Sequence, residues 1–162
     1  MLNTETLKPS TVLAAMVEGL KKSKSDPHFE LDIMSYGKVT NEKCYGCTAL
    51  ITFVEMFGQG QTPSEVMIAY AKTRENQLER VNVTPAKALN LDGNHSESEF
   101  YNTLAFVIEI AQTGKVSHLI GFFTGSFNNC SFNSRWDLKN DNWEGQLSVV
   151  EAAIVEMIAA GL

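Results

Sequence analysis

The chain has 162 residues, a length typical of one domain, and its composition of 44% hydrophobic and 20% charged residues excludes global disorder. Nineteen acidic and thirteen basic residues give a net charge of −6, which argues against nucleic-acid binding because that function needs a basic surface. The sequence shows neither an N-terminal signal peptide nor an apolar run near the roughly 20 residues that span a bilayer, so we expect a cytoplasmic protein without membrane contact.

The first predicted element is a helix from Thr11 to about Lys22, with Ser10 or Thr11 as its N-cap. Its apolar residues recur at helical spacing and form one stripe, which consists of Val12, Leu13, Met16, Val17 and Leu20. After Asp26, apolar and polar residues alternate in Phe29–Ile33, a pattern that predicts a short half-buried strand.

A second helix is predicted over Cys44–Phe57, where apolar residues surround almost the whole helix. A helix that is apolar on nearly all sides belongs at the centre of a core. Gly58 stands where a residue in the left-handed conformation would end this helix.

The clearest helix start is Thr62-Pro63-Ser64-Glu65, because Thr62 can cap the helix, proline suits the first position and Glu65 can complete a capping box. We expect this helix to reach about Arg80. A further short helical turn is predicted over Thr84–Leu89.

A second capping box, Ser96-x-x-Glu99, predicts a helix that ends at Gly114. The apolar segment Val116–Phe123 is short and lies between glycines, and is predicted to be a strand. Residues 125–140 are rich in Ser, Asn and aromatic side chains and are expected to be irregular. Asp141-x-x-Glu144 then predicts the start of a last helix that runs to about Ala160.

Together these elements predict a mainly α protein, an irregular bundle of about five helices with a minor two-stranded element. We expect residues 1–162 to form a single globular domain. An α+β fold in which Phe29–Ile33 pairs with Val116–Phe123 is the alternative.

Cys44-Tyr45-Gly46-Cys47 is the segment that most suggests chemistry. A helix N-terminus lowers the pKa of a thiol, so Cys44 could act as a nucleophile and Cys47 as the resolving thiol. The polar segment Lys38–Lys43 precedes the motif, however, whereas a thioredoxin-like fold has a long apolar strand there. The competing interpretation is that both cysteines are small buried residues that pack in the core. Three cysteines, an odd number, and no secretory segment favour free thiols in a reducing compartment.

Zinc is the only cofactor that the sequence suggests, and the expected default is no cofactor. Zinc needs four ligands, and Cys44, Cys47, Cys130 and His118 could supply them. No second pair of ligands stands at a typical zinc-site spacing, so this set rests on composition alone.

The aromatic and Asn-rich segment is the candidate binding surface. Phe132, Asn133, Arg135 and Trp136 combine stacking surface with adaptable hydrogen-bonding groups. Irregular segments often carry binding sites, and Trp and Arg are frequent anchors of protein interfaces. The competing interpretation is that the aromatic side chains fill the core of the bundle.

The sequence contains neither a glycine-rich phosphate loop nor a serine nucleophile elbow, so we expect a protein that is not an enzyme. We therefore predict a protein that acts by protein–protein interaction, as a regulator, an inhibitor or an immunity-type protein. Its negative charge would suit a basic partner. The alternatives are a thiol-redox or zinc protein that uses Cys44 and Cys47, and a helical domain that binds a small molecule.

Overall fold

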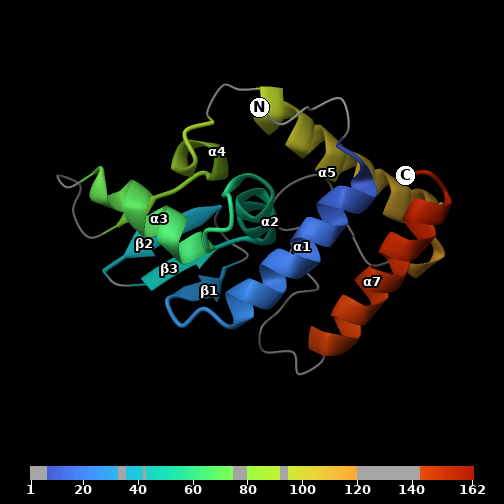
Figure 1. Ribbon diagram of the computed structural model, residues 1–162, viewed down its shortest axis with the longest axis horizontal. Helices are drawn as coiled ribbons and strands as arrows, with labels where there is room; N and C mark the ends of the chain where they lie inside the picture. The colour runs from blue at the N-terminus through green and yellow to red at the C-terminus, as the bar shows by residue number, and fades with distance from the viewer. Residues whose placement is uncertain (1–6, 33–35, 42, 75–79, 92–94, 120–142) are drawn as a thin grey trace.

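The computed structural model describes residues 7–32, 36–41, 43–74, 80–91, 95–119 and 143–162. Its helices in chain order are α1 (Pro9–Lys24), α2 (Thr48–Phe57), α3 (Pro63–Lys72), α4 (Pro85–Ala88), α5 (His95–Thr113), the short 3₁₀ helix η2 (Ser117–Leu119) and α7 (Trp143–Ala159). Its strands are β1 (Phe29–Leu31), β2 (Gly37–Thr40), β3 (Lys43–Gly46) and β4 (Val81–Asn82). The molecule is thus rich in helix, with a small sheet beside α3 (Figure 1).

The four strands form one mixed sheet in the order β1-β3-β2-β4, in which only β1 and β3 are parallel. The register aligns one residue from each strand in a buried row, which consists of Phe29, Cys44, Val39 and Val81. The neighbouring residues form a second row, which consists of Glu30, Tyr45, Lys38 and Asn82. Because side chains alternate between the faces of a strand, the sheet has an apolar inner face and a polar outer face.

The hairpin of β2 and β3 was not predicted, since Lys38–Lys43 resembles a polar connection. Its polar character comes from the outer face, where the Lys38 Nζ atom lies 2.7 Å from an Asp32 oxygen and the Lys43 Nζ atom lies 2.6 Å from a Glu30 oxygen. Strands of four residues are also too short to show a clear alternation.

Helix α2 lies at the centre of the core, as its apolar circumference predicted. Leu50, Ile51 and Phe53 are fully buried. The predicted start at Cys44 is wrong, because Cys44 belongs to β3 and the helix begins at Thr48. The short strand β3 runs almost directly into α2, so the apolar residues of the strand were assigned to the predicted helix.

The two predicted glycine stops differ in their outcome. Gly114 follows the last residue of α5, as predicted, and its φ of 71° lies in the left-handed region. Gly58 ends α2, but its φ is −84°, so the predicted left-handed conformation is wrong. The chain instead takes positive φ angles at the next two residues, Gln59 (53°) and Gly60 (86°).

The capping box of α3 is confirmed. The Thr62 hydroxyl accepts a hydrogen bond from the Glu65 N–H at 3.3 Å, and a Glu65 carboxylate oxygen accepts one from the Thr62 N–H at 2.8 Å. The helix ends at Lys72, however, and not near Arg80, because Val81–Asn82 joins the sheet as β4.

The short helix predicted after Thr84 is confirmed as α4, whereas two other predicted helix starts are wrong. Helix α1 begins with Pro9 and has Lys8 at its N-cap without a side-chain cap, so neither Ser10 nor Thr11 caps it. Helix α5 already includes His95, which places Ser96 inside the helix. In both cases the helix starts earlier than the capping signals suggested.

The α+β alternative describes the fold at least as well as a mainly α class, because the helices pack with a four-stranded sheet, and the predicted helical bundle is not confirmed. Phe29–Leu31 is a strand, as predicted, but its partner is β3 and not Val116–Phe123. Val116 is buried and Ser117–Leu119 forms the 3₁₀ helix η2, while residues 120–123 lie outside the described part of the chain.

Helix α1 packs against both α2 and α7. Its contact with α2 is close at Gly19, where an added Cβ atom would lie 2.6 Å from the Cγ2 atom of Ile51. At its start, the Ser10 hydroxyl donates a hydrogen bond to the carbonyl oxygen of Leu162 at 2.6 Å. This bond ties the first turn of α1 to Leu162, which lies shortly after the end of α7.

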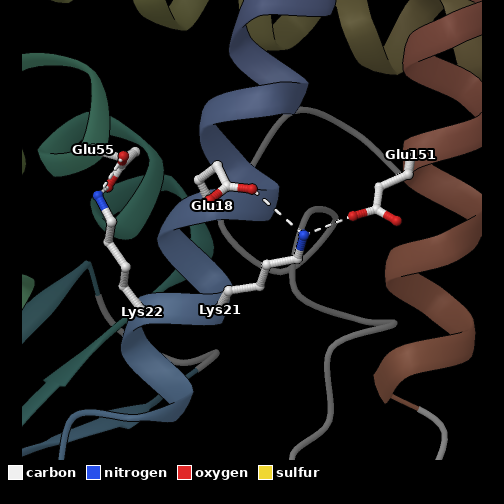
Figure 2. A network of polar contacts seen from close by, with 5 residues as sticks. All are labelled: Glu18, Lys21, Lys22, Glu55 and Glu151. Atoms are coloured by element: carbon white, nitrogen blue, oxygen red, sulfur yellow. Dashed lines mark hydrogen bonds and ion pairs between the residues drawn. The ribbon is translucent and has the colours of Figure 1, made fainter.

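Ion pairs join α1 to its two neighbours on the surface (Figure 2). The Lys21 Nζ atom lies 2.7 Å from a Glu151 oxygen of α7 and 3.4 Å from a Glu18 oxygen of α1. The Lys22 Nζ atom lies 2.7 Å from a Glu55 oxygen of α2. Exposed pairs of this kind stabilise a protein by about 0–1 kcal/mol each, so the buried apolar side chains hold these helices together.

Candidate functional site

The cysteine pair lies in the core. Cys44 stands in the buried row of the sheet and Cys47 is the N-cap of α2, and both are fully buried cysteines outside any disulfide. Burial, and to a smaller extent the charge of Asp26, raises the pKa of the Cys44 thiol to about 11. The predicted lowering of its pKa is therefore wrong, because α2 begins only at Thr48. A thiol that stays protonated near neutral pH is a poor nucleophile, and Cys44 packs as a small apolar residue.

The four residues considered for zinc do not form a metal site in the part of the chain that the structure describes. No three His, Cys, Asp or Glu side chains lie close enough together there to hold a metal ion. His118 is exposed on η2, and its Nδ1 atom lies 2.7 Å from a Glu156 oxygen. Cys130 lies outside the described residues, and Cys44 and Cys47 are enclosed in the core.

Glu156 of α7 binds the start of η2 through four groups of Ser117 and His118. One carboxylate oxygen accepts a hydrogen bond from the Ser117 N–H at 2.8 Å, and the other accepts one from the Ser117 hydroxyl at 2.9 Å. These bonds and the contact with His118 lower the pKa of the Glu156 carboxyl to about 2. The carboxylate thus fixes η2 on α7.

Ser64 and Ser23 are buried to nearly the same extent, but among the described residues only the Ser64 hydroxyl has a hydrogen-bond partner. Ser64, at 5% exposure, donates a short hydrogen bond to a carboxylate oxygen of Asp26, whose other oxygen accepts the His28 N–H at 2.9 Å. Ser23, at 6% exposure, has a buried hydroxyl without a hydrogen-bond partner among the described residues. Ser64 bonds directly to a carboxylate and not to an imidazole, so this group resembles a structural connection more than a nucleophile with its base.

The predicted binding residues Phe132, Asn133, Arg135 and Trp136 lie outside the described residues. A candidate surface therefore has to be sought elsewhere in the structure. The distribution of charge gives the first indication. Residues 1–91 carry ten basic and ten acidic side chains, whereas residues 92–162 carry three basic and nine acidic ones, so the whole net charge of −6 lies in the second part.

Exposed apolar side chains give the second indication, and they concentrate on α7. Val155 is 69% exposed and Ile158 is 62% exposed, and a third residue of the same helix, Val149, is 38% exposed. Val155 and Ile158 are three positions apart and are therefore neighbours on the helix surface. The opposite side of α7 is buried through Leu147, Val150, Ala153 and Met157. The helix thus has an apolar residue pair on its outer side that the other described residues do not cover.

This apolar pair gave only a weak signal in the sequence. Val149–Ala160 is apolar on several sides, and a pattern of this kind predicts burial without showing which residues stay exposed. The register of α7 against α1 and η2 decides which residues remain exposed. That register depends on tertiary contacts such as Lys21 with Glu151 (Figure 2).

Comparison with known proteins adds no family to this description. No protein-family model, no curated protein sequence and no solved structure matches the chain. Within the described residues, no helix is both long enough and apolar enough to cross a membrane.

Proposed function

We propose that this protein acts by binding another protein, and that the outer side of α7 around Val155 and Ile158 is the contact surface. The observation that carries the proposal is the exposure of two adjacent branched side chains, 69% and 62%, on a helix whose opposite side is buried. Water contact of such side chains is unfavourable, and burying each fully contributes about 1.5–3 kcal/mol. Adjacent exposed apolar side chains surrounded by polar residues are typical of interaction sites.

The charge of the surrounding part of the chain indicates the kind of partner. Lys21 and Lys24 of α1 pair with Glu151 and Glu144, which neutralises two glutamates of α7 locally. The sequence of residues 92–162 still carries an excess of acidic residues, and such a surplus of negative charge favours a basic partner. A basic partner with an apolar contact area would associate fastest with such a surface.

The proposal retains a non-enzymatic role as a regulator, an inhibitor or an immunity-type protein. A reducing compartment such as the cytoplasm would suit it, because Cys44 and Cys47 are not joined in a disulfide. The thiol-redox alternative has no supporting observation, since both thiols are buried and the pKa of Cys44 is raised.

Site-specific crosslinking tests the surface and identifies the partner. A photoreactive residue is placed at Val155 and, as the control, at the exposed Lys72 of α3, and crosslinked proteins are identified by mass spectrometry. The partner is then purified and its affinity is measured for the wild type and for Val155→Ser/Ile158→Ser. We expect a basic partner that crosslinks at position 155 alone, an affinity at least about tenfold weaker in the double variant and a weaker affinity in high salt. Equal crosslinking at both positions, or an unchanged affinity, would refute the proposal.

A further inference from the structure

We infer that the hollow between α3 and α4 is a binding site for a small planar organic anion, one that carries a carboxylate or a phosphate group. The hollow has a volume of about 510 Å³ and is lined by Ala69, Tyr70, Thr73, Arg74, Lys87, Ala88 and Asn90. This volume lies within the range of about 300–1,000 Å³ that small-molecule sites have. The site is separate from the outer side of α7 and does not depend on the protein-binding proposal.

The charge of the lining residues selects an anion. Arg74 and Lys87 bring two positive charges, and none of the lining residues that the structure describes is acidic, although the whole chain carries a net charge of −6. Within the described part of the chain, neither cation forms an ion pair with an acidic side chain. Their charges are therefore available to a ligand. Arg74 also presents a planar fork of N–H donors, which matches the oxygens of a carboxylate or a phosphate.

The other polar groups of the hollow also favour a ligand that accepts hydrogen bonds. Lys87 provides three N–H donors, and the Asn90 side chain provides two more. The Thr73 hydroxyl already donates to the Tyr70 carbonyl oxygen at 2.6 Å. Among the lining side chains that the structure describes, donors thus outnumber acceptors, and an oxyanion would satisfy them.

Tyr70 explains why the ligand would carry a flat ring. The guanidinium carbon of Arg74 lies 5.2 Å from the centre of the Tyr70 ring, so the cation and the aromatic ring already lie together. A second ring can stack on a phenol ring or on a guanidinium plane. A ring with one oxyanion would use both the stacking surface and the donors.

Basic residues near helix C-termini also have a simpler explanation, because they neutralise the negative end of the helix dipole. Beside this hollow three carbonyl groups near the helix ends already have hydrogen-bond donors of their own. In α3 the Thr73 and Arg74 N–H groups bind the Tyr70 and Ala71 carbonyl oxygens at 3.1 and 2.9 Å. In α4 the Asn90 N–H binds the Lys87 carbonyl oxygen at 3.1 Å. The cations therefore have little left to neutralise at these helix ends.

Titration with matched ligands tests the inference on the full chain. The probes are benzoate, phenyl phosphate and inorganic phosphate, with benzamide as the neutral ligand of benzoate shape, and binding is followed by NMR chemical shifts and calorimetry. The variants are Arg74→Gln and Lys87→Gln, and Lys72→Gln is the control because it removes one exposed charge of α3 that does not line the hollow.

We expect benzoate or phenyl phosphate to bind the wild type, and each lining variant to weaken binding by at least about tenfold, as the loss of a charged hydrogen bond implies. The Lys72→Gln variant should bind within about twofold of the wild type, since a distant exposed charge is screened by salt. Stronger binding of phenyl phosphate than benzoate identifies a phosphate ligand, and the reverse order identifies a carboxylate. Equal affinity for benzamide, an equal loss in Lys72→Gln, binding of inorganic phosphate alone or no binding of either aromatic anion would each overturn the inference.

Discussion

Replacing Ser23 with alanine should stabilise the protein, whereas the same replacement at Ser64 should destabilise it. The two side chains are buried to nearly the same extent, at 6% and 5% exposure, so the volume removed and the burial are matched. They differ in their hydrogen bonds. Ser64 donates to the Asp26 carboxylate, and the Ser23 hydroxyl has no partner among the described residues.

The expected magnitudes follow from this difference. An unsatisfied buried hydroxyl destabilises a protein by about 1–3 kcal/mol, and alanine is favoured over serine inside a helix by up to about 0.7 kcal/mol. Ser23→Ala should therefore raise the free energy of unfolding by about 1.5–3 kcal/mol, which corresponds to a rise in Tm of about 3–10 °C for a chain of this size. Ser64→Ala removes a hydrogen bond to a charged group and should lower the free energy of unfolding by about 1.5–3 kcal/mol.

Urea unfolding at neutral pH, together with calorimetric melting, measures both variants against the wild type. The slope of unfolding against urea should stay constant, so that the change in midpoint reports stability alone. A destabilised Ser23→Ala variant would refute the reasoning, because it would show that the hydroxyl has a bonding partner in the folded protein. A Ser64→Ala variant as stable as the wild type would show that solvent replaces the serine at Asp26.

Three further perturbations test other parts of the structure. In Gly19→Ala the gain of about 1 kcal/mol in helix propensity should be outweighed by overpacking against Ile51. Urea unfolding should therefore show a net loss of about 1–2 kcal/mol in the free energy of unfolding, and a net gain would disprove the close contact of α1 with α2. The pKa of the Glu156 carboxyl is lowered to about 2, so its stabilising effect is present above about pH 4.5 and is lost as the pH falls toward 2. When stability is followed in an acid titration, Glu156→Gln should lack this loss, and parallel stability curves for the variant and the wild type would contradict the prediction. Because the pKa of the Cys44 thiol is raised to about 11, only about one Cys44 in a thousand is a thiolate at pH 8. Peptide mass spectrometry should therefore show that iodoacetamide labels Cys44 at least about 100-fold more slowly in the folded than in the urea-unfolded protein, and fast labelling in the folded state would refute the burial of Cys44.

The local signals of the sequence that were strong and complete predicted the structure correctly. The capping box of Thr62 and Glu65 closes in both directions, the apolar circumference of α2 places it at the centre of the core, and Gly114 ends α5. Each of these signals lies within one helix or at its end, so residues close in sequence suffice to specify it.

The sheet could not be predicted in the same way, because its pattern is distributed over four short segments. Cys44 shows the difficulty most clearly. Its row partners Phe29, Val39 and Val81 are far apart in sequence, and only pairing makes them one buried layer. The same error affected the chemistry, since a cysteine taken for a helix start was assigned a lowered pKa and the buried strand position raises it.

The candidate surfaces were also not accessible from the sequence. Nothing in its pattern separates the exposed Val155 from the buried Val150, because the packing of α7 on α1 decides which of them is covered. Arg74 and Lys87 likewise come from two helices, and only their packing brings both to one hollow. Sites of this kind arise from tertiary contacts between segments that each have an unremarkable sequence.

The bond between the Ser10 hydroxyl and the Leu162 carbonyl oxygen has a practical meaning for engineering. A short peptide could join residue 162 to the beginning of α1, and new termini could then be opened in the exposed turn at Gln59 and Gly60, which no strand or helix needs. Such a circular permutant would keep every helix and strand while changing the order in which they are synthesised. A fluorescent reporter for α7 is better inserted at that turn than attached after residue 162, where it would press on the first turn of α1.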